Sequence, residues 1–162
     1  MARESWHEYF MKIAQEVSTR ATCDRLKVGA VIVKDHRILT TGYNGSLPGT
    51  PHCDEAGHIV KDGHCVRTIH AEANAVLQAA KFGISLDGAT CYVTFKPCLN
   101  CLKILLGSGV QKIIYREIYG NEKSYFGEAE LLDGLNPFQS LDDALAEEKA
   151  ARAACHKEAG NE

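Results

Sequence analysis

Four residues in two short motifs have the types and the spacing to form a catalytic metal site. His70 precedes Glu72 by two positions, and Cys98 and Cys101 stand in a Pro-Cys-x-x-Cys motif. Cysteines three positions apart lie on one face of a helix start, where the positive end of the helix stabilises thiolates. One imidazole and two thiolates leave the fourth tetrahedral position of Zn²⁺ open for water. Three protein ligands plus water are typical of a catalytic zinc site, whereas four protein ligands are typical of a structural one.

Glu72 is predicted to move protons rather than to bind the metal. Side chains two positions apart do not share a helix face, so Glu72 is not expected to join His70 on the ion. Its carboxylate would instead reach the metal-bound water, whose pKa zinc lowers to about 7. A carboxylate placed there can accept a proton and deliver it to a leaving group. The alternative, a core histidine with buried cysteines, is weaker because these residue types occur together and in this order.

The elements that position these residues alternate between helix and strand. We predict, in order, helix 6–22, strands 28–33 and 38–43, helix 68–82, strand 89–95, helix 97–106, strand 112–115 and two further helices at 124–132 and 141–159. Thr68 is the expected N-cap of the second helix, and Pro97 is the expected first residue of the third. Strands that alternate with helices favour parallel pairing through right-handed crossovers. The sequence therefore predicts an α/β fold with a mixed sheet between helices.

The bulk composition narrows the class of protein. A chain of 162 residues is expected to form one domain, and its net charge of -3 argues against a general nucleic-acid binder. The first ten residues hold no apolar segment typical of a secretory signal, and no stretch of about 18 apolar residues occurs. We therefore expect a cytoplasmic protein. Seven cysteines, an odd number, in a reducing compartment indicate metal binding better than disulfides.

The chain resembles the deoxycytidylate (dCMP) deaminases of the cytidine-deaminase-like superfamily. The resemblance covers about residues 20–119 and includes, besides the two motifs, the Gly-Tyr-Asn-Gly stretch at 42–45 and the stretches 28–30, 65–75 and 92–94. It implies a three-layer α/β/α fold with a five-stranded mixed sheet. It also implies a single zinc-dependent deaminase domain over residues 1–162, in which about 136–162 form a C-terminal extension or tail helix. The implied reaction is hydrolysis of dCMP to dUMP and ammonia, which feeds thymidylate synthesis.

The resemblance also implies where the substrate binds. Asn44 would contact the sugar or base, although an asparagine before Gly45 is also an ordinary turn residue. The ring would pack on Ala71, at the start of its helix, and against the backbone from Thr94 to Pro97. The phosphate needs cations or polar groups. The candidates, which one sequence does not rank, are Arg25, Lys27, Arg67 and Tyr119.

A second, structural zinc site is implied by the same resemblance. The residues expected to hold it are Cys23, Cys53, His64 and Cys65, with His52 and His58 in reserve. The ion would replace missing regular structure in the loop-rich stretch 44–67. Adjacent residues rarely bind one metal together, so His64 and Cys65 are not both expected to serve. The alternative is a set of small buried cysteines with exposed histidines. Cys91 is expected in the core and Cys155 is expected to be incidental.

The implied partners are a small nucleotide and further copies of the chain. The resemblance implies a homo-oligomer (hexamer or dimer), activation by dCTP and inhibition by dTTP, and Mg²⁺ accompanying such a triphosphate. No membrane and no nucleic acid is expected. One rival is a tRNA adenosine deaminase or another nucleobase deaminase of the same superfamily. The tRNA adenosine deaminases share both motifs but resemble a Glu-Pro-Cys pattern, whereas this chain has Lys96 in place of that glutamate. Another is a non-catalytic zinc-containing nucleotide sensor, which would have no need of a proton carrier such as Glu72.

Overall fold

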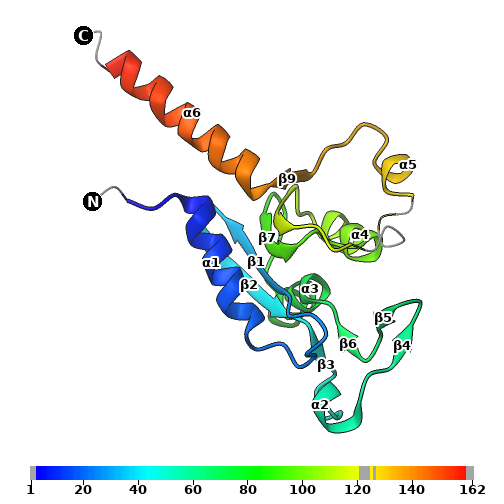
Figure 1. The fold of residues 1–162 in the computed structure, drawn as a ribbon. Helices are drawn as coiled ribbons and strands as arrows, with labels where there is room; N and C mark the ends of the chain where they lie inside the picture. The colour runs from blue at the N-terminus through cyan, green and yellow to red at the C-terminus, as the bar shows by residue number, and fades with distance from the viewer. Residues whose placement is uncertain (1–2, 121–124, 126, 160–162) are drawn as a thin grey trace.

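The computed structural model describes residues 3–120, 125 and 127–159 (Figure 1). The helices are α1 (Trp6–Ser18), α2 (Cys53–Ala56), α3 (Ala71–Phe82), α4 (Leu99–Gly107), α5 (Glu128–Leu132) and α6 (Leu141–Ala159). The strands are β1 (Gly29–Lys34), β2 (Arg37–Tyr43), β3 (Gly45–Ser46), β4 (Val60–Lys61), β5 (His64–Cys65), β6 (Thr68–Ile69), β7 (Thr90–Phe95), β8 (Lys112–Glu117) and β9 (Phe138–Ser140). None of the described helices is long and apolar enough to cross a membrane.

The main sheet has five strands in the order β2-β1-β7-β8-β9. β1 pairs antiparallel with β2 and β7, whereas β8 pairs parallel with β7 and β9. Side chains of β1 alternate between two cores: Ala30 and Ile32 pack with α3 and α4, and Val31 and Val33 pack with α1. Helices therefore cover both faces (Figure 1). This arrangement confirms the predicted three-layer α/β/α fold with a five-stranded mixed sheet.

The order of the elements up to residue 117 agrees with the sequence, but two helix starts differ. Thr68 lies in β6, where it pairs with Ser46 of β3, and His70 is the N-cap of α3. Similarly, Cys98 is the N-cap of α4, so Pro97 precedes the helix instead of beginning it. Because β3 pairs with β6, the backbone of residues 68–69 is extended and not helical. This contact between distant segments outweighs the local capping preference of a threonine.

The stretch 44–67 and the C-terminal segment contain more regular structure than expected. Four short elements, β3, α2, β4 and β5, interrupt the stretch that was predicted to be a loop. At the C-terminal end, α6 spans the predicted 141–159, and β9 supplies a fifth strand whose position the sequence did not reveal. Of the predicted helix 124–132, α5 forms residues 128–132, and residues 124 and 126 lie outside the described part of the chain.

A close backbone approach fixes the start of α3 against β2. A Cβ atom added at Gly42 would lie 2.2 Å from the carbonyl oxygen of Ala71 and 2.4 Å from the amide nitrogen of Ala75. The hydroxyl of Thr40, on the same strand, donates to the Ala75 carbonyl at 3.1 Å. Only glycine therefore allows β2 to approach α3 closely enough to hold the residues around Ala71 in place.

Gly42→Ala is expected to lower the free energy of unfolding by about 3 kcal/mol, because the new methyl group overlaps backbone atoms that cannot move independently. Gly107→Ala is the matched control, since a Cβ there meets no atom within 4 Å. At the end of α4 it should change stability by less than about 1 kcal/mol. Urea unfolding measures both variants. Equal stabilities would show that α3 can move away from β2 at little cost.

Candidate active site

His70, Cys98 and Cys101 come together at the N-terminal ends of two helices. Their ligand atoms all lie within 4.8 Å of one another, with Nδ1 of His70 3.7 Å from the Cys98 sulfur and 3.4 Å from the Cys101 sulfur. His70 is the N-cap of α3 and Cys98 is the N-cap of α4, yet neither side chain makes a capping hydrogen bond. The side chains instead converge on a common point, as a tetrahedral metal site with one open position requires.

The electrostatics of the three residues favour bound metal. The pKa of Cys98 is lowered, because the Cys101 thiol donates a hydrogen bond to it and the His70 imidazole lies beside it. The pKa of Cys101 is raised in turn by the neighbouring Cys98 sulfur and by burial. The raised pKa of Cys101 favours its thiol form. A divalent cation bound by both sulfurs would displace the thiol proton and stabilise both thiolates.

Glu72 lies in the first turn of α3 and is almost completely buried, with 4% of its surface exposed. It lines a cavity together with His70, Ala71 and Cys98. Burial raises the pKa of its carboxyl group, and the nearby Cys98 sulfur raises it further, while its own backbone amide and His70 oppose the shift. A carboxyl group with a raised pKa at the floor of a cavity can hold a proton and release it to a ligand.

The cavity wall includes four of the seven residues expected to contact substrate. Asn44, Ala71, Arg25 and Tyr119 line the cavity. Lys27 and Thr94 do not line it, and their contacts with substrate stay predictions. Thr94 is buried behind the wall, where its hydroxyl accepts a hydrogen bond from the Gly29 amide at 3.2 Å.

Arg67, a further phosphate candidate, is directed at the loop backbone. Its Nε donates to the Gly57 carbonyl at 2.8 Å and one terminal nitrogen lies 3.4 Å from the Ala56 carbonyl. The side chain therefore braces the turn after α2, and it is absent from the cavity wall.

Asn44 combines both interpretations considered for it. Its Oδ1 accepts from the Val28 amide at 2.7 Å and its Nδ2 donates to the Leu26 carbonyl at 2.8 Å, so the side chain fixes the approach to β1. The residue is 7% exposed and still lines the cavity. An amide group so held offers a rigid edge to a ligand, because a carbonyl oxygen and an amino group each retain one further hydrogen-bonding position.

Sequence reasoning missed several residues of the cavity wall. The polar ones include Lys96 and Tyr125. His64, which was expected in the second zinc site, also lines the cavity. Tyr125 follows the region of clear motifs, and nothing in its neighbourhood marks it as a ligand. Lys96 stands directly before the Pro-Cys-x-x-Cys motif, and that adjacency was the only available signal.

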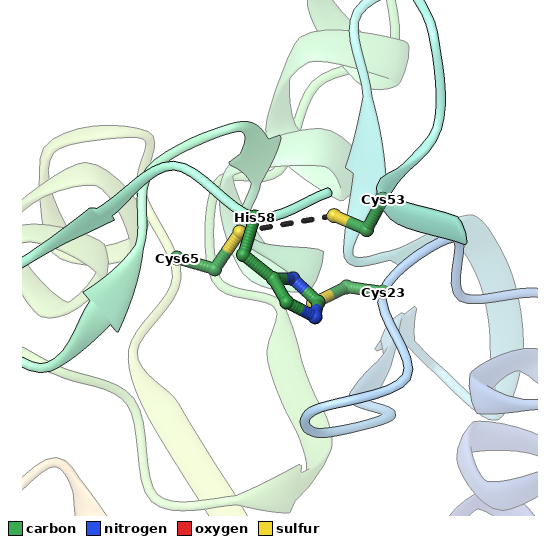
Figure 2. A group of neighbouring side chains, drawn as sticks. All are labelled: Cys23, Cys53, His58 and Cys65. Atoms are coloured by element: carbon green, nitrogen blue, oxygen red, sulfur yellow. Dashed lines mark hydrogen bonds between the residues drawn. The ribbon is translucent and has the colours of Figure 1, made fainter. Parts of the chain in front are cut away.

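A second cluster lies beside the cavity and consists of Cys23, Cys53, His58 and Cys65 (Figure 2). Their ligand atoms lie within 4.8 Å of one another. The sulfurs of Cys53 and Cys65 are 3.7 Å apart, and the Cys23 sulfur is 3.7 Å from Nδ1 of His58. The three expected cysteines are therefore brought together.

The histidine of this cluster corrects the prediction. His58, which was held in reserve, takes the place expected for His64, and His64 lies outside the cluster in the described structure. Its ring faces Tyr119 in the cavity wall, with ring centroids 6.1 Å apart. Neighbouring side chains of a strand point to opposite sides, so within β5 only one of His64 and Cys65 can face the cluster.

Comparison with known proteins places the chain in a family. A model of the cytidine and deoxycytidylate deaminase zinc-binding region matches residues 4–117. The chain belongs to this family. The family description names zinc, and the His70, Cys98 and Cys101 group has the donor atoms of a zinc site.

Individual relatives agree with the family. The ComE operon protein 2 of Bacillus subtilis (strain 168) is 49% identical over 119 residues, covering 74% of this chain and 63%, less than two thirds, of that protein. The deoxycytidylate deaminase of Mycobacterium phage D29 is 39% identical over 127 residues, covering 71% of this chain and 97% of the phage protein. The crystal structure of the dCMP deaminase from the cyanophage S-TIM5, in complex with dCMP and dUMP, superposes with a TM-score of 0.71 at 31% identity. The superposition covers 86% of this chain and 99% of the cyanophage chain.

Glu72→Gln is expected to stabilise the metal-depleted protein at high pH. The pKa of Glu72 is raised in the folded protein, so this group stabilises the fold below the ordinary pKa of a carboxyl group. That contribution is lost as the pH rises through the folded-state pKa, because the buried group then becomes charged. Removing the charge should therefore add on the order of 1 kcal/mol at about pH 8 and less at about pH 5. Urea unfolding at both pH values measures the difference. The exposed Glu16, replaced by Gln on α1, is the control. A gain that does not grow with pH would contradict the buried-charge account.

Proposed function

We propose that this protein is a zinc-dependent deaminase that hydrolyses dCMP to dUMP and ammonia. The observation that carries the proposal is the convergence of His70, Cys98 and Cys101 beside the buried Glu72 at one cavity. Family membership supports the reaction type. The phage relative named deoxycytidylate deaminase and the cyanophage structure with dCMP and dUMP support this nucleotide as the substrate.

In the proposed mechanism Glu72 carries the protons. A zinc ion held by His70, Cys98 and Cys101 would lower the pKa of water and so supply hydroxide at neutral pH. Glu72 accepts the proton that the attacking water loses and transfers it to N3 of the cytosine ring as the C4–O bond forms. It then takes the proton of the new C4 hydroxyl group and passes it to the amino group as the C4–N bond breaks, the C4 carbonyl forms and ammonia leaves. The buried position of Glu72 keeps bulk water from competing for these transfers.

Arg25 and Tyr119 are the proposed ligands of the substrate phosphate. Both line the cavity. One terminal nitrogen of Arg25 donates to the Gly63 carbonyl at 3.0 Å, which orients the guanidinium group and leaves further N–H donors for an anion. Asn44 and Ala71 are proposed to contact the sugar and the base, as the resemblance implies.

The second cluster is proposed to hold a structural zinc. Three thiolates and one imidazole are a closed, four-coordinate donor set. Nδ1 of His58 faces the cluster, and its Nε2 lies 3.1 Å from a carboxylate oxygen of Asp24. A carboxylate on the outer nitrogen fixes the tautomer and ring orientation that metal binding by the inner nitrogen needs. The ion would join residue 23 to three positions of the stretch 44–67.

The remaining parts of the proposal rest on the family resemblance. Residues 1–162 form one zinc-dependent deaminase domain that assembles as a homo-oligomer, either a dimer or a hexamer, in the cytoplasm. We also propose that dCTP activates the enzyme and dTTP inhibits it, with Mg²⁺ accompanying the triphosphate. Large apolar side chains exposed on α3 and α4, namely Leu77, Phe82 and Ile104, are consistent with contacts between copies.

Ammonia release from dCMP, deoxycytidine, cytidine and dCTP tests the substrate. We expect dCMP to be preferred, because a phosphate that meets an oriented arginine adds binding energy. Glu72→Gln should lower turnover by at least about 10²-fold while the protein keeps its zinc, since the variant loses only the proton carrier. The same assays with added dCTP and dTTP test the effectors.

Two results would reject the assignment. A zinc-loaded protein inert toward all four compounds would require a test of tRNA adenosine as substrate. A Glu72→Gln protein with undiminished turnover would rule out the assigned mechanism.

Zinc analysis distinguishes the two metal sites. The wild-type protein should contain two zinc ions per chain, and His58→Ala about one. His64→Ala, the matched control from the same stretch, should retain two. Cys98→Ser should lose the other ion. One zinc in the wild-type chain, or loss of zinc from His64→Ala but not from His58→Ala, would contradict the assignment of the second cluster.

A further inference from the structure

Lys96 lines the cavity and contacts three residues from a later part of the chain. It lies between β7 and α4, and its ammonium nitrogen is 2.6 Å from Oε1 of Glu128, the first residue of α5. The same nitrogen lies 4.9 Å from the centroid of the Tyr125 ring and 4.5 Å from that of the Phe138 ring on β9. Lys96 therefore makes one ion pair and two cation–π contacts, all to residues at least 29 positions further along the chain.

This ion pair differs from an ordinary pair on the surface. The side chains of Lys96 and Glu128 are each 17% exposed, whereas Lys112 and Glu147, 3.9 Å apart, are 43% and 72% exposed. Screening by water and salt makes exposed pairs weak, and partial burial strengthens the attraction. The second carboxylate oxygen of Glu128 is buried with no hydrogen-bond partner among the described residues. The charge of Glu128 thus depends on Lys96.

The contacts of Lys96 reach the cavity through Tyr125. Both residues line the cavity, and the Tyr125 hydroxyl donates to the Lys96 carbonyl at 3.3 Å. Lys96 is two positions from Cys98, and its amide donates to the Glu117 carbonyl at 2.7 Å. The start of α4, which carries Cys98 and Cys101, is therefore attached to the wall that Tyr125 contributes.

That wall comes from outside the stretch that matches the family. The match ends at residue 117, and Tyr119, Tyr125, Glu128 and Phe138 all follow it. Within the described residues, Lys96 is the side chain that ties Glu128 to the start of α4 by charge. A fixed attachment is needed because a wall that moves loses its complementarity to a ligand.

We propose that Lys96 is a positioning residue: through Glu128, Tyr125 and Phe138 it fixes the Tyr125 wall of the cavity and thereby sets the affinity for the nucleotide. This inference rests on the proposed function. Lys96 is not a phosphate ligand in this account, because its charge is already paired and two aromatic rings cover it.

Steady-state kinetics with dCMP and deoxycytidine test the proposal. The variants are Lys96→Met, Lys96→Arg and Glu128→Gln. Lys112→Met, from the exposed ion pair, is the matched control. Lys96→Met and Glu128→Gln should raise KM for both compounds by about tenfold, with kcat within about threefold and zinc content unchanged. Lys96→Arg should return KM to within about threefold of wild type, and Lys112→Met should leave it unchanged.

The Glu128→Gln variant separates positioning from direct phosphate binding. If Lys96 bound the phosphate, removing its partner's charge would lower KM for dCMP and leave deoxycytidine unaffected. That result would overturn the proposal, as would an unchanged KM in Lys96→Met.

Hydrogen exchange tests the attachment without any substrate. The amides of Leu131 and Asp133, which are bonded within and at the end of α5, should exchange faster in Lys96→Met than in wild type and Lys112→Met. Unchanged exchange would overturn the proposal even if KM rose. A wild-type chain that deaminates neither compound would reject the proposed function, and the exchange result would then decide alone whether Lys96 holds this wall.

Discussion

The candidate site depends on one constraint: two helices must begin at the same point in space. His70 and Cys98 are the N-caps of α3 and α4, and their side chains meet only because both helices pack on the same face of the sheet. Buried alanines of α3 and the fully buried Leu102 and Leu105 of α4 set that packing. Two positive helix ends directed at one place favour thiolates there. The fold thus supplies the electrostatic conditions for the metal before any ligand is considered.

Local sequence patterns predicted the parts of the site that are themselves local. The three-residue spacing of Cys98 and Cys101, the helix starts within about two residues and the alternation of strands and helices all depend on neighbouring positions. The choice of His58 over His64 depends on how a turn after α2 meets the loop at residue 23, which involves contacts 35 positions apart. The wall residue Tyr125 likewise reaches Lys96 from 29 positions away. Single-sequence patterns carry no information about such pairings.

The second cluster and the candidate active site share a cavity wall. Cys23 and Cys65 belong to the second cluster and also line the cavity that holds His70 and Glu72. An ion bound there would hold the stretch 44–67 in its place and with it a wall of the cavity. Loss of structure in that stretch would therefore affect nucleotide binding, even though none of the four residues of the second cluster takes part in the proposed chemistry.

The distribution of charge shows how a chain with a net charge of -3 can hold an anionic substrate. Its cavity needs only a few oriented cations, and each must be held in place. Arg25 is oriented by the Gly63 carbonyl in the turn between β4 and β5, whose second strand contains Cys65. Lys96 is neutralised by Glu128 and so leaves Arg25 as the unneutralised cation among the described wall residues. In the proposed function Arg25 and Tyr119 would bind the phosphate, the starts of α3 and α4 would supply the chemistry, and Tyr125 would complete the cavity wall between them.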